Sequence, residues 1–324
     1  KLAVAYVVRH RSLRLSASTR KRSPNMRLAV HYTPKMVADA SSFSPSAGKP
    51  ALVMDSWARL RLPLDVWAPA PVTRQQLCLA HDRDFVDGVL DGRISNGFGI
   101  RRASVASSLP FTSGAMLAAA RDALANGWGA IAPCSGFHHA GYDFAGGFCT
   151  FNGLMVTAAV LLTNGAVRTV GIIDFDQHWG DGTDHIIRRL GLRERVLHYS
   201  PTRDFGRPQQ AEAFLARLPD LLRPFADCDL VLYQAGADPH VDDPLGGWMT
   251  TDQLHRRDEK VFGALRAWGV PVAWNLAGGY QRDNHGSIQP VLAIHDNTLR
   301  AFANTWNIGA DAPTDPARAN AMAA

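Results

Sequence analysis

Four acidic or imidazole side chains lie within eight residues of one another in the segment GIIDFDQHWGDGT, at 171–183. They are Asp174, Asp176, His178 and Asp181, and the residues just before them are apolar. In an extended segment, residues i, i+2 and i+4 point to the same side, so Asp174, Asp176 and His178 should converge. Two carboxylates on one side repel each other unless a cation lies between them. An imidazole beside them completes a mixed oxygen and nitrogen ligand set.

A second apolar run, DLVLYQAGAD at 229–238, ends at Asp238. If its strand lies beside the first, Asp176, His178 and Asp238 supply three protein ligands and leave a coordination position open, as in catalytic metal sites. This ligand set suits Zn²⁺, with Fe²⁺ and Co²⁺ as alternatives. A simpler interpretation is that each acid caps a helix or carries a solvated loop charge. Helix capping is a reasonable role for Asp181 considered alone, but it does not explain why all of these polar residues lie at strand ends.

Polar residues also follow two other strand-like runs. His138 and His139 are adjacent in a glycine-rich loop after the run GAIAP at 129–133. Such a pair indicates general acid–base chemistry. Tyr280 follows a Gly-Gly pair at the end of another run, where its phenol could donate to a developing oxyanion. One histidine or one tyrosine at such a place is more often structural, but polar ends on four runs favour a common site.

The apolar runs alternate with helical patterns along the chain. Because these runs are continuously apolar, they predict a parallel sheet with helices on both faces. Ligands of such sheets bind beyond the carboxyl ends of the strands. Residues 92–112 and 201–208 are expected to be loops, and 309–324 a frayed tail. We expect strands at 27–32, 129–133, 169–176, 195–200, 229–236 and 271–278, and helices at 113–127, 152–165, 209–225 and 250–269.

Basic residues are concentrated at the start of the 324-residue chain, whose net charge is +5. Residues 1–25 contain seven Lys or Arg and no Asp or Glu, which leaves the remainder with a net charge of −2. We interpret 1–25 as a basic leader outside the fold, with a mitochondrial-type transit peptide and a functional basic tail as alternatives. Residues 26–324 are expected to form a single catalytic domain.

Charge, hydropathy and cysteine content argue against several classes of protein. The near-neutral body argues against a nucleic-acid partner. No apolar run approaches the roughly 18–20 residues that cross a bilayer, so no membrane partner is expected. None of the four cysteines belongs to a C-x-x-C pair, which argues against a structural zinc knot. A disulfide framework is not expected in a domain of this size, and we predict a reducing, cytoplasmic location.

Five motifs resemble, in order, the histone deacetylase superfamily, which includes bacterial histone deacetylase-like amidohydrolases and acetylpolyamine amidohydrolases. They are HDRDFVDGVLDG, GFHHAGYDFAGGFCTFNGL, IIDFDQHWGDGT, AGADPHVDDPLGG and LAGGY, and the resemblance runs from about residue 27 to 300. It implies an α/β, arginase-like open fold around a central eight-stranded, mostly parallel sheet with helices on both faces. The order Asp-x-Asp-x-His with one further distant Asp favours mononuclear deacetylases over two-metal arginases.

The resemblance also implies a role for individual residues of this chain. Gly147 and Phe148 would line a channel for an acyl-lysine-type substrate, and a structural potassium ion would lie near Asp174 and Ser200. The implied metal ligands are Asp176, His178 and Asp238, and the implied catalytic residues are His138 and His139 with their carboxylate partners Asp174 and Asp181, together with the carbonyl-polarising Tyr280.

The implied reaction is the zinc-dependent hydrolysis of an N-acetyl or other N-acyl amide, which releases a free amine and a carboxylate. The substrate would be an acylated amine, either a small molecule or an acetyl-lysine. Two alternatives stay open: a small-molecule amidase that acts on a non-acetyl substrate, and a catalytically silent relative that binds ligand. The sequence indicates no particular oligomeric state.

Overall fold

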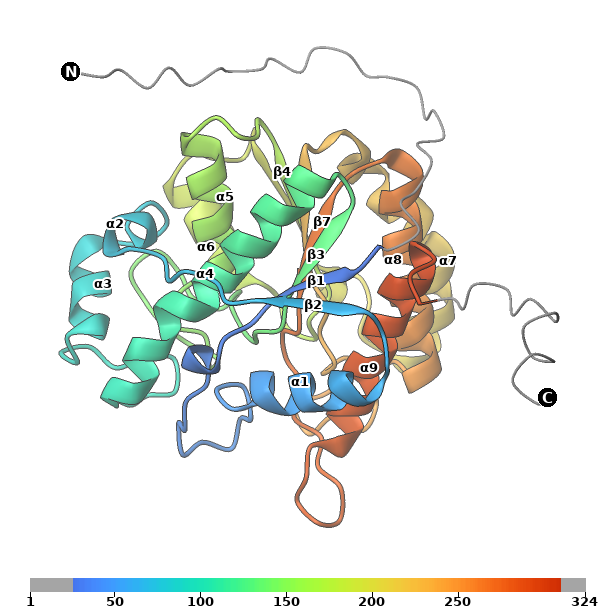
Figure 1. Cartoon of the computed structure of the whole chain (residues 1–324), viewed down its shortest axis with the longest axis horizontal. Helices are drawn as coiled ribbons and strands as arrows, with labels where there is room; N and C mark the ends of the chain where they lie inside the picture. Colours follow the sequence, from blue (N-terminus) through green and yellow to red (C-terminus); the bar gives the residue numbers. More distant parts are fainter. Residues whose placement is uncertain (1–25, 310–324) are drawn as a thin grey trace, which may run out of the picture.

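The computed structural model describes residues 26–309, in which seven strands form one sheet (Figure 1). All pairings are parallel, in the order β2-β1-β3-β7-β6-β4-β5. The resemblance implied eight strands, and the described residues supply one fewer. The leader at 1–25 and nearly all of the predicted tail lie outside the described residues. The strands are β1 (Leu28–His31), β2 (Leu64–Trp67), β3 (Gly129–Ala132), β4 (Val170–Asp174), β5 (Val196–Tyr199), β6 (Leu230–Gln234) and β7 (Val272–Asn275).

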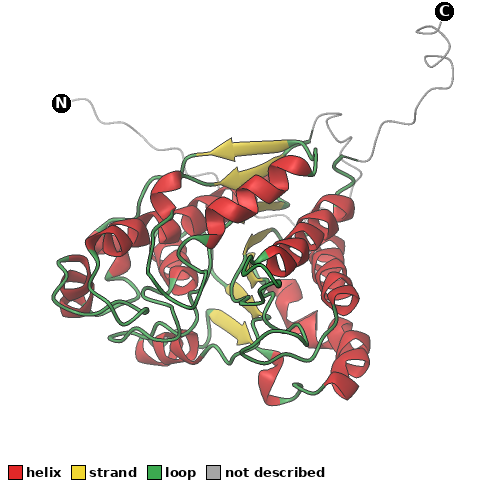
Figure 2. Cartoon of the chain, turned by 90° about the horizontal axis from the view of Figure 1, so that it is seen from below, coloured by secondary structure: helices red, strands yellow, loops and turns green. Residues whose placement is uncertain are grey.

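Helices cover both faces of this sheet, as predicted, and Figure 2 shows the strands running through the middle of the molecule between them. One buried apolar cluster joins the sheet to α1, α7, α8 and α9, and a second joins it to α2 through α6. Among the described helices, none is both long and apolar enough to cross a membrane. The helices are α1 (Lys49–Arg59), α2 (Arg74–Leu77), α3 (Arg83–Leu90), α4 (Ala103–Asn126), α5 (Gly153–Thr163), α6 (Asp181–Arg189), α7 (Ala211–Leu222), α8 (Thr251–Trp268) and α9 (Gln289–Thr305).

The strands that carry the candidate residues are the buried centre of the sheet. Every residue of β3, β4, β6 and β7 is buried, which explains why their sequences are continuously apolar. These four strands are neighbours, in the order β3-β7-β6-β4. Because all are parallel, their carboxyl ends meet at one edge of the sheet, and the segments that follow them lie side by side.

The expected loop at 92–112 is wrong in its second half, because α4 begins at Ala103 and continues through it. Serine, threonine and proline made this stretch look irregular. Inside the helix the hydroxyls of Ser108 and Thr112 donate to carbonyls three residues earlier, each at 2.8 Å. Pro110 is also accommodated within α4, and its carbonyl accepts a hydrogen bond from the Val72 N–H. Packing of α4 across the sheet therefore overrides the weak local preference.

The segment 201–208 is closer to expectation. It holds a short 3-10 turn at Pro201–Arg203 and the first residue of another at Pro208–Gln210. The edge strand β2 had not been predicted from the sequence. Two of its four residues are exposed, so it lacks the continuous apolar pattern of the central strands.

Candidate active site and metal centre

The predicted site residues come together at the carboxyl edge of the sheet. Each of the four central strands contributes at least one of them, at its last residue or in the segment that follows. They are His138 and His139 after β3, Asp174, Asp176 and His178 at and after β4, Asp238 after β6, and Tyr280 after β7.

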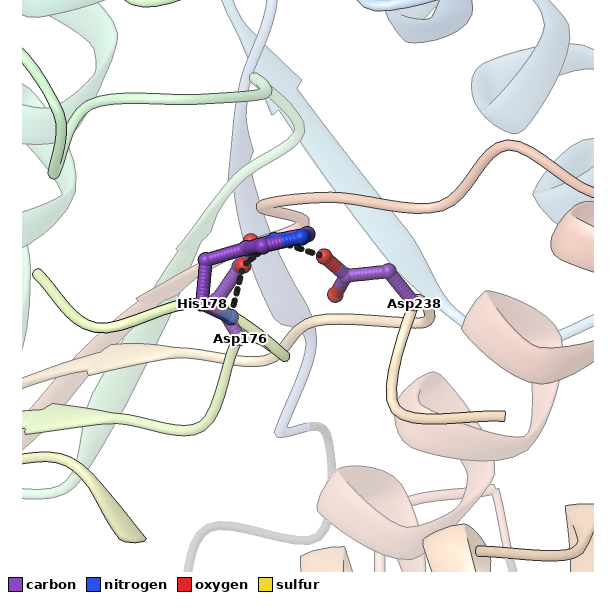
Figure 3. A group of neighbouring side chains, drawn as sticks. All are labelled: Asp176, His178 and Asp238. Carbon is purple, nitrogen blue, oxygen red and sulfur yellow. Dashed lines mark hydrogen bonds and ion pairs between the residues drawn. The ribbon is translucent and has the colours of Figure 1, made fainter. Parts of the chain in front are cut away.

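Asp176, His178 and Asp238 form a group whose potential ligand atoms all lie within 4.8 Å of one another (Figure 3). His178 Nδ1 is 3.1 Å from Asp176 Oδ1 and 3.3 Å from Asp238 Oδ2. Ligand atoms on a tetrahedral zinc ion with bonds of about 2.0–2.1 Å lie about 3.4 Å apart, so these separations fit such an ion. The arrangement depends on a bend, since β4 ends at Asp174 rather than at the predicted residue 176.

The electrostatics of the three ligands also favour a cation. Burial and the negative charge of Asp176 raise the pKa of the Asp238 carboxyl, because two buried carboxylates repel. Hydrogen bonds to Asp176 and Asp238 raise the pKa of His178 to about 11. The imidazolium thus stands between the carboxylates where a metal ion would supply the positive charge. Asp238 Oδ2 is buried, and its 3.3 Å contact with His178 Nδ1 is an ion pair that metal binding would replace.

Two glycines allow the ligand segments to approach one another. The Gly278 N–H donates to Asp176 Oδ2 at 2.8 Å, and a Cβ at Gly278 would lie only 2.3 Å from Asp238 Oδ2. A Cβ at Gly236 would lie 2.6 Å from Asp238 Oδ1 and 2.7 Å from the Cα of Asp176. Both positions therefore require glycine for a close approach of backbone to ligand.

His138 is buried and paired with a carboxylate. Its Nδ1 is 2.8 Å from Asp174 Oδ2, and its Nε2 is 3.5 Å from Asp176 Oδ1. Burial alone would lower the pKa of His138, but the charges of Asp174 and Asp176 outweigh it and raise the pKa to about 9. His138 is therefore protonated at neutral pH in the metal-free protein.

His139 differs from His138 in charge and in exposure. Its Nδ1 is 2.6 Å from Asp181 Oδ1, and Asp181 is the first residue of α6. Burial and the positive charge of His138 lower the pKa of His139, although Asp181 partly opposes them. A carboxylate can only accept, so Nδ1 carries the proton, and the Nε2 lone pair of the neutral ring is free to take one.

Tyr280 follows β7 and lies close enough to Asp238 and Asp176 for their charges to act on its phenol. Its side chain is buried, and its backbone N–H donates to Asp243 Oδ2 at 2.8 Å. Burial and the charges of Asp238 and Asp176 raise the pKa of the phenol, so Tyr280 stays protonated and can donate a hydrogen bond. The centre of the Phe148 ring is 5.8 Å from that of the Tyr280 ring. Gly147 lies against the His139 ring, since a Cβ at Gly147 would be only 2.3 Å from His139 Cδ2. The two predicted channel residues therefore adjoin the tandem histidines and the tyrosine.

Comparison with known proteins identifies the family. The histone deacetylase domain model matches residues 48–206 and 195–293. The chain belongs to the histone deacetylase family. It is 30% identical over 260 residues to an uncharacterised protein of Picosynechococcus sp., covering 72% of this chain and 84% of the relative.

Named members of the family also match this chain. Histone deacetylase 2 of Arabidopsis thaliana is 29% identical over 191 residues, and this match spans 53% of the chain and about half (49%) of the relative. The crystal structure of an acetylpolyamine aminohydrolase from Burkholderia pseudomallei superposes with a TM-score of 0.64 at 21% identity, covering 86% of this chain and 99% of that one, which shows the shared fold. Family and named relatives together support a hydrolase of the deacetylase type.

The potassium site implied by the resemblance stays a prediction. Asp174 Oδ1 accepts hydrogen bonds from Gln234 Nε2 at 2.8 Å and from the Asp176 N–H at 3.3 Å. Ser200 follows β5, and its Oγ is 3.4 Å from Thr202 Oγ1. Both residues are buried.

Two buried side chains next to this candidate site had not been singled out from the sequence. His198 on β5 has Nε2 at 3.6 Å from Asp174 Oδ2 and Nδ1 at 2.9 Å from Asp184 Oδ1. An imidazole inside an otherwise apolar strand was the signal available. Lys49 is fully buried, and its Nζ donates to the Ala277 carbonyl at 2.6 Å. Burial lowers the pKa of Lys49 to about 8, and no local pattern marked this residue.

Proposed function

We propose that this chain is a zinc-dependent deacetylase that hydrolyses an N-acetyl or other N-acyl amide to a free amine and a carboxylate. One observation carries the proposal. Three potential metal ligands, Asp176, His178 and Asp238, lie beside a buried His–Asp pair, a second His–Asp pair and a protonated tyrosine. The separations and charges of the three ligands suit Zn²⁺, with Fe²⁺ or Co²⁺ as alternatives.

The two histidines divide the acid–base work according to their environments. A bound zinc ion would polarise the acyl carbonyl and lower the pKa of a water molecule. His139, neutral and oriented through Nδ1 by Asp181, takes the proton of that water at Nε2 and later donates it to the leaving amine. His138, buried and paired with Asp174, tunes the electrostatics beside the reacting group.

Tyr280 completes the site by donating to the oxygen on which negative charge develops. Because its pKa is raised, the phenol keeps its proton. The hydrogen bond from the Tyr280 backbone N–H to Asp243 Oδ2 fixes the backbone from which the side chain extends. A donor of this kind acts more strongly on the oxyanion than on the ground-state carbonyl, so it accelerates the reaction rather than merely binding substrate.

The substrate is an acylated amine, either a small molecule or an acetyl-lysine, whose chain would pass Gly147 and Phe148. The positions of these residues beside His139 and Tyr280 support this role. Potassium near Asp174 and Ser200 would serve a structural purpose. None of the four cysteines forms a disulfide, which fits the proposed cytoplasmic location.

A panel of acylated amines tests the proposal. Protein stripped with a chelator and reloaded with zinc is incubated with an acetyl-lysine peptide, an acetylated polyamine and amides with other acyl groups, and free amine is quantified by mass spectrometry. We expect amine release from at least one acetylated substrate, and none from His139→Gln, which keeps the size and polarity of the ring site. Turnover of non-acetyl amides alone would favour the amidase alternative. No turnover at all would favour a silent relative.

A further inference from the structure

A single buried arginine lies behind the metal centre and joins the two strand ends that carry its carboxylates. Arg257 belongs to α8, and its side chain is 1% exposed. One nitrogen, Nη1, donates both to the carbonyl of Phe175, at 3.1 Å, and to the carbonyl of Gly236, at 2.9 Å. Phe175 directly precedes the ligand Asp176, and Gly236 stands two residues before the ligand Asp238.

These two carbonyls lie at the point where the regular strand pairing ends. The last paired residues of β4 and β6 are Asp174 and Gln234. A few backbone hydrogen bonds continue past them, such as the one from the Phe175 N–H to the Gln234 carbonyl at 3.0 Å. Arg257 adds to these bonds by joining the Phe175 and Gly236 carbonyls through one guanidinium group.

The guanidinium itself is held by a second set of contacts. Arg257 Nε donates to Asp258 Oδ1 at 2.8 Å. The same carboxylate accepts hydrogen bonds from the hydroxyls of Tyr233 and Thr298, the latter at 2.6 Å. All four side chains are buried, and an arginine fork bound on two sides has a fixed orientation. Arg257 therefore offers a rigid support rather than a mobile charge.

We propose that Arg257 is a positioning residue that sets the separation of the Asp176 and Asp238 carboxylates and so the geometry and affinity of the metal site. This inference rests on the metal site of the proposed function but not on its reaction. Because metal ligation tolerates displacements of only about 0.2 Å, a support that fixes both ligand segments at once acts directly on binding. Loss of a residue that holds a metal ligand in place typically lowers metal affinity by about 10–100-fold.

The variant Arg257→Lys separates positioning from charge. A lysine Nζ ends one bond short of the arginine Nη1, so it keeps the positive charge beside Asp258 but loses the reach to both carbonyls. We expect Co²⁺ affinity to fall about 10–100-fold and the visible absorption spectrum of the bound Co²⁺ to change in intensity. Wild-type affinity with an unchanged spectrum would overturn the proposal.

The matched control is Thr298→Val, which has nearly the same volume and lies in the same buried network. It removes a bond to Asp258 but leaves both contacts of Arg257 Nη1 with the backbone carbonyls. We expect its metal-free melting temperature to fall while Co²⁺ affinity stays within about twofold of the wild type. If Thr298→Val weakens Co²⁺ binding as much as Arg257→Lys does, the network is merely structural and the proposal fails.

Two further comparisons keep the test decisive. If Arg257→Lys does not fold, the charge-neutral pair Arg257→Gln with Asp258→Asn carries the same expectations for Co²⁺. A wild-type protein that binds Co²⁺ but hydrolyses no acylated amine would refute the proposed function and leave the role of Arg257 standing. A wild-type enzyme with full turnover, together with unchanged Co²⁺ binding in the arginine variants, would refute the role of Arg257 alone.

Discussion

Adding one methyl group at Gly278 should weaken metal binding without disturbing the fold. The new Cβ would lie 2.3 Å from Asp238 Oδ2 and 2.8 Å from Asp176 Oδ2, whereas ordinary contacts begin at 3.4 Å. At least one ligand oxygen must therefore move by about 1 Å, several times the displacement of about 0.2 Å that ligation tolerates. We expect Gly278→Ala to bind zinc about 100-fold more weakly, which corresponds to about 2.8 kcal/mol.

The backbone does not confound this test, because Gly278 is not among the glycines with a left-handed φ. The control is Gly263→Ala on α8, where a Cβ meets no atom within 4 Å and should stabilise the helix by about 0.5–1 kcal/mol. Zinc affinity is measured by competition with a chromophoric chelator, and folding by thermal unfolding of the metal-free proteins. A folded Gly278→Ala protein that binds zinc within about threefold of the wild type would refute the proposed geometry.

Three further predictions concern the ligands, the tyrosine and pH. Asp176→Ala, His178→Ala and Asp238→Ala should each lose most of the bound metal, and elemental analysis showing full occupancy in all three would contradict the assignment. Tyr280→Phe should retain metal while kcat falls about 10²-fold or more, with a smaller change in KM, and an unchanged kcat would make the hydroxyl structural. Because His178, whose pKa is raised to about 11, must lose its proton to bind metal, zinc affinity should rise at least about tenfold per pH unit between pH 6 and 8. The raised pKa of Asp238 would make the rise steeper, and a flat profile in calorimetric titrations would argue against these ligands.

The sequence predicted the central strands and the convergence of the site because both depend on local patterns. Continuous apolar runs mark strands buried on both faces, and polar residues directly after them mark the edge where ligands bind. The structure brings Asp176 and His178 together, but simple strand alternation does not explain this, and Asp174 lies instead 2.8 Å from His138 Nδ1. The strand ends at Asp174, and a bend turns His178 back so that its N–H donates to Asp176 Oδ1 at 3.0 Å.

The supporting residues escaped prediction because their partners are distant in the chain. The Lys49 ammonium donates to a carbonyl 228 positions away, and Arg257 contacts a carbonyl 82 positions away. Charged residues are rarely buried without partners. The sequence around Lys49 and around Arg257 shows no partner, so both residues would be assigned to a solvent-exposed helix face. Only the three-dimensional packing supplies those partners. The start of α4 was missed for the opposite reason, since its local residues favour a loop and tertiary packing decides.

Zinc-dependent turnover tests the central claim most directly. Protein stripped of metal by a chelator is titrated with Zn²⁺, and the release of free amine from the best acetylated substrate is followed at each addition, with Asp238→Ala treated in parallel. We expect no activity in the stripped protein, a linear recovery that reaches its maximum at one equivalent of zinc per chain, and no recovery in Asp238→Ala. Amine release that is independent of zinc, or that survives unchanged in Asp238→Ala, would contradict a catalytic metal at this site.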